Sequence, residues 1–280
     1  MFLKNIFPYF LLISQVSSAS TGIILKADNT IDFYENGEFI RQIIQLPSSH
    51  YLISYTGDFF FHAKYFSEDK KYSLHSCNIL TAKCMPIVTP ELTGDIVSIS
   101  FSDNGFGLVA RKDNKIDIYE NNKYIKTFPI EGREIKDIAF IGDFYYVLQI
   151  KDSRYSWVSS EIKKCNFELS YCTPILEINQ QITGISFNEN DEGYALTKDG
   201  YVLYFYKGSY LWQKKFLNYY ADNIFNTDQG LFIRQQVVEK NNDINQPNKY
   251  TANFFVCHTR ENYCEKILNT NSFPVYGSFK

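Results

Sequence analysis

Three pairs of cysteines are the residues of this sequence with the clearest capacity for chemistry. Each pair has six residues between its members: Cys77 and Cys84, Cys165 and Cys172, and Cys257 and Cys264. Paired thiolates could hold zinc, but zinc sites usually place two to four residues between such ligands. Six cysteines allow fifteen disulfide pairings, and only the three local pairings respect the repeat. The sequence therefore predicts three disulfides, each pinning a hairpin between neighbouring strands.

The other reactive side chains form no recognisable local signature. The four histidines are scattered, no serine lies in a nucleophile elbow, and glycine-rich phosphate loops are absent from the sequence. Calcium ligands could come from four equivalent turn positions, but Asp and Asn are also the residues that tight turns favour. These four positions are Asp103, Asp143, Asn190 and Asp228. We interpret them as turn residues, and we predict no metal and no cofactor.

The first nineteen residues have the layout of a secretory signal peptide. Lys4 precedes an apolar run at 6–13, and small residues then lead to Ala19. The run is shorter than the roughly 20 apolar residues that span a bilayer, and no later stretch is apolar for long enough. We therefore expect a mature domain at 20–280 without a transmembrane segment. Together with the disulfides, the leader predicts a soluble secreted or periplasmic protein.

The charge balance argues against nucleic acid as a partner. Removing the leader takes away one of the 28 Lys and Arg residues, which leaves 27 against 31 Asp and Glu and a net charge of −4. Proteins that bind nucleic acid usually present a strongly basic face. A mildly acidic chain with six arginines does not predict one.

The positions of the cysteines belong to a longer repeat of the chain. A glycine-led segment that starts at Gly22 recurs from Gly107 and, more loosely, from Gly193, at spacings of 85 and 86 residues. Each copy is followed by a longer half that ends in a cysteine pair. The chain is therefore read as three units of about 86 residues.

Alternation of apolar and polar residues predicts eight short strands in the middle unit, joined by turns rich in Asn, Asp and Gly. They fall at 97–101, 107–111, 115–119, 123–128, 135–141, 144–150, 157–165 and 172–178. Four strands in about 43 residues match the size of one propeller blade. The sequence thus predicts an all-β protein, a six-bladed β-propeller built as three two-blade repeats.

The two ends of the chain suggest how the ring closes. The first unit lacks an innermost strand before Gly22, and the last unit is followed by a surplus segment at 272–280. We predict that this C-terminal segment supplies the missing strand of the first blade, which would remove exposed sheet edges.

The segment 185–212 resembles the repeat of propellers related to the photosystem II stability factor and the Asp-box proteins. The resemblance is carried by Phe187, Gly193, Gly200, Gly208 and Trp212. An Asp-box has Ser, Asp, Gly and Trp at close spacing, and the matching segment at 102–108 has no tryptophan in place. The resemblance implies a propeller and leaves the activity open.

We expect a monomeric binding or scaffold module for a protein or ligand, rather than an enzyme. The candidate surface is the face with the loops between second and third strands and between blades, where mixed charges gather. Its candidate residues are Asp69, Lys112, Asp113, Asp152, Arg154, Lys198, Asp199 and Asn242.

The alternative is a hydrolase or lyase with a site at the mouth of the central channel, similar to a sialidase or a calcium-dependent lactonase. A sialidase-like site needs three convergent arginines, and a calcium site needs oxygens that converge from several blades. Only the tertiary structure can show such convergence.

Overall fold

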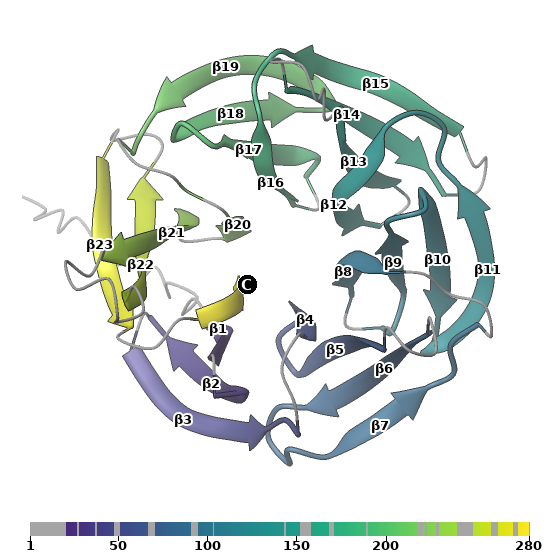
Figure 1. Cartoon of the computed structure of the whole chain (residues 1–280), viewed down its shortest axis with the longest axis vertical. Helices are drawn as coiled ribbons and strands as arrows, with labels where there is room; N and C mark the ends of the chain where they lie inside the picture. The colour runs from purple at the N-terminus through teal and green to yellow at the C-terminus, as the bar shows by residue number, and fades with distance from the viewer. Residues whose placement is uncertain are drawn as a thin grey trace, which may run out of the picture.

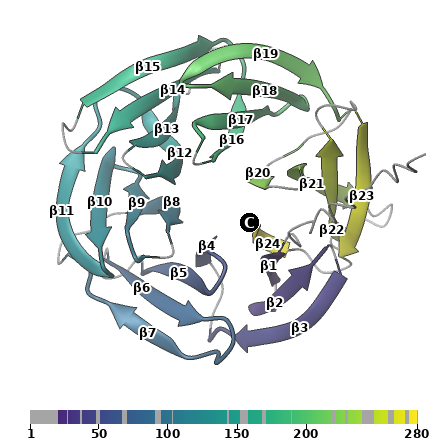
Figure 2. The same cartoon turned by 180° about the vertical axis from the view of Figure 1, so that it is seen from behind.

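The computed structural model has six β-sheets, and Figure 1 and Figure 2 show them arranged in a ring, seen from its two ends. The structure describes residues 21–279 except 27, 37, 48–50, 67–70, 91–94, 103, 143, 152–157, 168–170, 189, 218–220, 222, 228–229, 240–248, 259–262 and 271–273. The predicted signal peptide therefore lies outside the described residues. Among those that are described, no helix is long and apolar enough to cross a membrane.

The described residues form twenty-four strands, which follow one another along the chain. The first twelve are β1 (Thr21–Lys26), β2 (Thr30–Glu35), β3 (Glu38–Gln45), β4 (Tyr51–Tyr55), β5 (Phe59–Phe66), β6 (Lys71–Asn78), β7 (Cys84–Ile87), β8 (Ile96–Phe101), β9 (Gly107–Arg111), β10 (Lys115–Glu120), β11 (Lys123–Pro129) and β12 (Glu134–Ile141). The others are β13 (Phe144–Lys151), β14 (Ser159–Asn166), β15 (Tyr171–Ile178), β16 (Ile182–Phe187), β17 (Glu192–Thr197), β18 (Tyr201–Tyr206), β19 (Ser209–Lys215), β20 (Asn223–Thr227), β21 (Gly230–Glu239), β22 (Lys249–His258), β23 (Tyr263–Thr270) and β24 (Pro274–Phe279).

Each sheet has four antiparallel strands and forms one blade. The strand orders are β24-β1-β2-β3 for blade 1, β4 to β7 for blade 2, β8 to β11 for blade 3, β12 to β15 for blade 4, β16 to β19 for blade 5 and β20 to β23 for blade 6. The prediction of an all-β, six-bladed propeller is confirmed. The predicted strands of the middle unit also agree closely with β8 to β15, and β9 has the predicted bounds.

The hydrophobic core is divided into six clusters, and each cluster joins two neighbouring blades around the ring. One cluster, for example, joins Ile31 of blade 1 to Phe60 and Cys77 of blade 2. Another joins Phe61 of blade 2 to Phe101 of blade 3. Because each sheet buries both of its faces against neighbours, its central strands are apolar on both sides, as the fully buried β9 shows.

A close contact between phenylalanine and glycine explains the glycines at positions 107 and 193, which begin two of the repeated segments. Phe101 pairs with Gly107 in blade 3, and Phe187 pairs with Gly193 in blade 5. A Cβ atom at Gly107 would lie 2.1 Å from the Phe101 ring, and one at Gly193 would lie 2.0 Å from the Phe187 ring. Any side chain at these positions would displace the ring, so only glycine fits.

The C-terminal strand β24 lies inside blade 1, where it pairs with β1. The register places Phe279 opposite Gly22, which is the same pairing of phenylalanine with glycine as in blades 3 and 5. β24 also contacts β4 and β20, which are the innermost strands of the two adjacent blades. Residues from the two ends of the described chain thus share one sheet (Figure 2).

Three disulfides cross-link the third and fourth strands of alternate blades. The bonds are Cys77–Cys84, Cys165–Cys172 and Cys257–Cys264, as the spacing predicts. In each case the two cysteines face each other across the ladder. The described residues hold no free cysteine.

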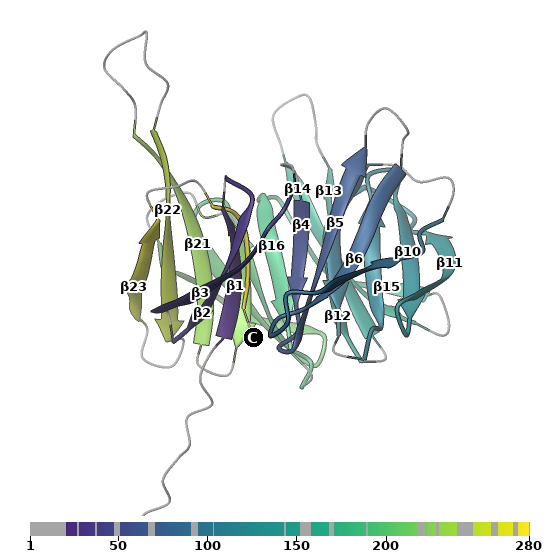
Figure 3. The ribbon, with the colours of Figure 1, turned by 90° about the horizontal axis from the view of Figure 1, so that it is seen from below.

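The antiparallel order gives the ring two distinct ends (Figure 3). We call the end with the turns between first and second strands and between third and fourth strands the hairpin end, and it includes the disulfide-linked hairpins. We call the opposite end, with the turns between second and third strands and the connections between blades, the loop end.

Candidate functional site

The predicted charged residues that the structure describes lie at the loop end. Lys112 and Asp113 are exposed in the turn between β9 and β10, and Lys198 and Asp199 are exposed in the turn between β17 and β18. The other four candidates, Asp69, Asp152, Arg154 and Asn242, lie outside the described residues.

Turn geometry accounts for part of the repeated sequence at the loop end. Asn29, Asn114 and Gly200 have positive φ values of 67°, 61° and 82° at equivalent positions, a conformation that Asn and Gly tolerate best. In blade 3, Asp113 lies 2.9 Å from Lys115 and 3.5 Å from Arg111. Much of the local charge is therefore balanced within the turn itself.

The innermost strands hold one carboxylate that joins three blades. Asp137 of β12 accepts hydrogen bonds from the Ser98 hydroxyl of β8 at 2.7 Å and from the Ile185 amide of β16 at 3.0 Å. It also accepts one from the amide of Ile138 at 2.9 Å. Both carboxylate oxygens are thus engaged in holding the inner strands together, so this group fits a structural role.

The four described arginines lie in separate places. Arg41 of β3 donates to the carbonyl of Ile79 at 2.7 Å, and Arg133 pairs with Glu177 at 2.5 Å. Arg111 and Arg234 lie on β9 and β21, in blades 3 and 6. The described residues thus do not assemble the three convergent arginines that a sialidase-like site requires.

A buried polar network lies between blades 2 and 3. Tyr72 of β6 donates to Asp117 of β10 at 2.8 Å, and its hydroxyl lies 2.6 Å from that of Tyr119. Thr127 donates to the other oxygen of Asp117, and Arg111 Nε lies 3.6 Å from Asp117. Burial raises the pKa of Tyr72 and of Tyr119, with Tyr119 and Asp117 adding to the shift of Tyr72.

The equivalent positions in the other two repeats favour a structural role for this network. Blade 1 has Lys26 and Asp32, whose charged atoms lie 2.9 Å apart. Blade 5 has Thr197 and Leu203, so both charges are replaced together by neutral side chains. A buried charge without its partner is costly, which explains why the two positions differ as a pair.

The described residues contain one group of three potential metal ligands, but it cannot act as a metal site in this state. His62, Cys77 and Cys84 have ligand atoms within 4.8 Å of one another, yet the two sulfurs are bonded to each other. Burial, with a smaller contribution from His75, lowers the pKa of His62 to about 3. The imidazole is therefore neutral and packs against His75 at 4.8 Å between ring centroids.

Exposed apolar side chains gather at the hairpins between third and fourth strands. Of the thirteen large apolar side chains that are exposed among the described residues, ten lie in these hairpins or within three residues of them. Every blade contributes at least one. The ten are Phe39, Ile40, Leu80, Met85, Ile125, Tyr171, Tyr206, Tyr210, Leu211 and Tyr263. We call this set the hairpin rim.

A pocket lies beside the disulfide of blade 2, at the hairpin end. Its volume is about 470 Å³, within the range of roughly 300–1,000 Å³ that is usual for ligand pockets. Apolar surface dominates its wall, and several polar side chains stand among the apolar ones. The lining residues are Phe59, Ser76, Asn78, Thr81, Lys83, Cys84 and Met85.

The corresponding place in blade 4 is filled. Lys164 stands where blade 2 has Ser76, directly before the first cysteine of the disulfide. Its Nζ reaches Asp191 of blade 5 at 2.5 Å and lies 4.3 Å from the ring centroid of Phe144. The hydroxyl of Tyr146 donates to the other oxygen of Asp191. One long cationic side chain thus occupies the space that serine leaves open.

The electrostatics of this ion pair reflect its partial removal from water. Burial lowers the pKa of Lys164 and raises the pKa of Asp191, with Lys207 opposing the latter shift. In blade 3 the position of Asp191 is taken by Gly105, and both residues have positive φ, 60° and 72°. Blade 2 and blade 3 therefore lack both members of the pair.

Sequence reasoning placed the candidate surface at the loop end and missed the pocket at the opposite end. The available signal was the residue before the first cysteine of each pair, which is Ser76, Lys164 and Val256 in the three units. The sequence alone could not show that this residue faces the next blade.

Solved structures with the same architecture provide the comparison with known proteins. No family model and no curated protein matches the sequence. The structure of U3-55K aligns with a TM-score of 0.55 and 10% identity, covering 88% of this chain and 76% of the other. The β-propeller domain of Cps50 (Swd1) from Myceliophteria thermophila gives 0.55 and 11%, covering 77% and 68%. The WD40 repeats of RRP9 give 0.54 and 9%, covering 88% and 75%.

At these identities the comparisons establish architecture and nothing finer. The resemblance of residues 185–212 to Asp-box repeats stays a prediction. The conclusion that the structure and the comparisons support is that this chain is a β-propeller with distant structural neighbours among WD40-repeat proteins.

Proposed function

We propose that this chain is an exported β-propeller that binds another protein and presents it on a rigid ring. The observation that carries the proposal is the hairpin rim. Scattered apolar residues are ordinary on protein surfaces, but a set concentrated at one end of the molecule is typical of a contact surface. The described residues of the loop end expose only Phe66 and Val88 from the same class of side chain.

The hairpins are suited to this task because they are held rigidly. In blades 2, 4 and 6 a disulfide fixes the two strands that flank the turn. In blade 3 the turn uses two residues with positive φ, Asn121 and Asn122, as a tight hairpin requires. A backbone that is already fixed loses little further conformational freedom on binding, which favours affinity.

Export is part of the proposal. We infer that the leader is cut between Ala19 and Ser20, that residues 20–280 form the mature domain, and that the protein acts as a monomer outside the cytoplasm. The three disulfides support an oxidising compartment. N-terminal sequencing of the protein isolated from its source tests the cleavage, and a chain that still begins at Met1 in the cytoplasm would contradict it.

The two ends of the ring can be compared directly. A rim variant would carry Leu80→Ser, Tyr171→Ser and Tyr263→Ser, and a loop variant would carry Lys112→Glu and Lys198→Glu. All five substitutions alter exposed side chains, so both variants should keep the melting temperature of the parent chain. A partner would first be identified by crosslinking and mass spectrometry, with the parent chain and both variants carried through the same procedure.

The decisive measurement is the dissociation constant for the purified partner. We expect the rim variant to weaken binding at least tenfold and the loop variant to leave it within twofold. The opposite result would move the site to the predicted loop residues. Equal affinity of all three proteins would show that neither surface is the binding site. Crosslinks between copies of the chain, formed without a partner, would indicate self-association instead.

A further inference from the structure

The pocket of blade 2 is open where serine stands in place of a lysine of the next unit. Ser76 lines the pocket, whereas its equivalent Lys164 extends across to Asp191. Phe59 also lines the pocket, whereas the ring of its equivalent Phe144 is covered by that lysine. Blades 2 and 4 therefore share one fold, but this space is open in blade 2 and is occupied by a lysine side chain in blade 4.

The chemistry of the wall indicates what the pocket would accept. Phe59 and the thioether of Met85 offer a surface for an apolar group. Sulfur and aromatic rings make favourable contacts with aromatic side chains in particular. Met85 is 62% exposed, and Leu80 on the same hairpin is 78% exposed. The apolar surface thus continues from the pocket onto the hairpin rim.

The polar side of the pocket is dominated by donors. Both the amide and the hydroxyl of Thr81 donate to Asn78 Oδ1, at 2.9 and 3.0 Å. The carbonyl oxygen of this side chain is therefore occupied, which leaves its NH₂ group to donate. Lys83 adds a positive charge, and the described residues provide no carboxylate in an ion pair with it. A carboxylate would complement this charge.

We propose that this pocket receives an aromatic or branched aliphatic side chain of a partner polypeptide, and that a carboxylate next to this side chain pairs with Lys83. A C-terminal Phe or Leu residue carries both groups at the required proximity. This inference rests on the proposed function, because it identifies one anchor of the partner on the hairpin rim.

Methionine supplies a direct reporter, since the chain has only Met1 and Met85. The full chain, labelled with ¹³C-methyl methionine, would be titrated with the acetylated peptide Gly-Ser-Gly-Phe and with the same peptide as its C-terminal amide. Met85→Leu assigns the two signals. We expect saturable movement of the Met85 methyl with the acid and at least tenfold weaker binding of the amide.

Three variants test the lining residues. Lys83→Gln should weaken binding of the acid to the level of the amide. Ser76→Lys should abolish binding, and its melting temperature would be compared with that of the parent chain, because Gly105 stands where blade 5 has the Asp191 partner of Lys164. Lys123→Gln is the matched control, an exposed lysine beside the corresponding hairpin of blade 3, and it should change nothing.

Several results would overturn the inference. They are an unmoved Met85 methyl at several millimolar peptide, equal affinity for acid and amide, or unchanged binding by folded Ser76→Lys. Binding of 3-phenylpropionate as tight as that of the peptide would assign the pocket to small acids instead. If the peptide fails while the rim variant still loses the purified partner, only this inference falls. If the peptide binds but the rim variant keeps its partner, the proposed function falls.

Discussion

Replacing Asp137 by alanine should weaken the ring at the place where three blades meet. This side chain lies on the innermost strand of blade 4 and accepts hydrogen bonds from Ser98 of blade 3 and Ile185 of blade 5. Alanine leaves the Ser98 hydroxyl and the Ile185 amide without their acceptor. These two contacts are the ones that cross between blades, so their loss acts on the packing of whole sheets.

The size of the effect follows from the number and type of the lost bonds. A hydrogen bond to a charged group contributes about 1.5–3 kcal/mol, so two of them amount to about 4 kcal/mol. A domain has a total stability of about 5–15 kcal/mol, which makes this a large fraction. The melting temperature should fall by roughly 10 °C.

Urea unfolding followed by tryptophan fluorescence and calorimetry would measure the change. Ser100→Ala is the matched control, because Ser100 accepts a single hydrogen bond between blades, from the Phe140 amide at 3.0 Å. It should cost about 1 kcal/mol. If Asp137→Ala cost no more than Ser100→Ala, the role of Asp137 in joining the blades would be refuted.

The pH dependence gives an independent check on the same residue. Burial raises the pKa of the Asp137 carboxyl above its ordinary value, against the opposing effect of its hydrogen-bond donors. Between the ordinary and the raised pKa, the folded chain binds more protons than the unfolded chain at this group. The free energy of unfolding therefore falls as pH rises through this window. Asp137→Asn should remove this contribution, and a wild-type advantage that grows with pH there would contradict the direction of the pKa shift.

Three further perturbations test the fold. Deletion of 271–280 removes β24 and its five registered residue pairs with β1. Each lost hydrogen bond costs about 1 kcal/mol, so the yield of folded protein should collapse. A truncated chain that melts at the same temperature as the parent would disprove closure by this strand. Asp117→Leu should cost about 3 kcal/mol, because it removes the buried one of the two carboxylates beside the buried Arg111 guanidinium. Arg111→Thr in addition gives a neutral pair like that of blade 5 and should restore most of the loss measured by urea unfolding; no recovery would argue against compensation. Replacing Cys165 and Cys172 by alanine should lower the unfolding free energy by about 2.5 kcal/mol, and reduction of the parent chain should then lower stability at least as far.

Local sequence patterns predicted most of the fold because they act through near neighbours. Alternating apolar residues and Asn-rich turns specify strands and hairpins within a few residues, so β9 was placed with its observed bounds. Cys77 and Cys84 have the same spacing as the two later cysteine pairs, which indicated disulfides between neighbouring strands, and the structure contains the Cys77–Cys84 bond. Positive φ at Asn121 and Asn122 also follows from the turn chemistry of the sequence.

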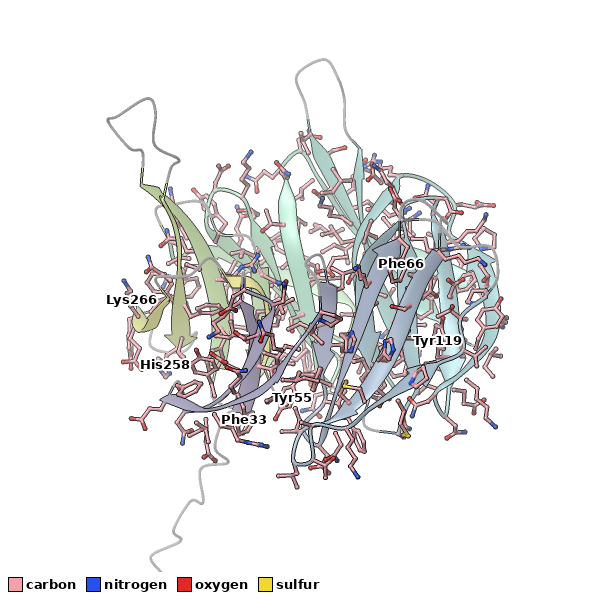
Figure 4. All side chains as sticks on the ribbon, turned by 60° about the horizontal axis from the view of Figure 1, so that its bottom comes forward. Phe33, Tyr55, Phe66, Tyr119, His258 and Lys266 are labelled. Atoms are coloured by element: carbon pink, nitrogen blue, oxygen red, sulfur yellow. A yellow bond between two sulfur atoms is a disulfide. The ribbon has the colours of Figure 1, made fainter. Side chains whose placement is uncertain are left out.

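The candidate site depended on contacts between blades, which no local pattern encodes. The sequence by itself determined an all-β chain of six four-stranded sheets, because strand period and turn residues are properties of the chain. Only the tertiary structure decided that Lys164 reaches across to Asp191 while Ser76 leaves a pocket. It also decided that the ten residues of the hairpin rim share one end of the molecule, since their common location arises from the strand directions of six blades. Figure 4 shows the described side chains on these blades.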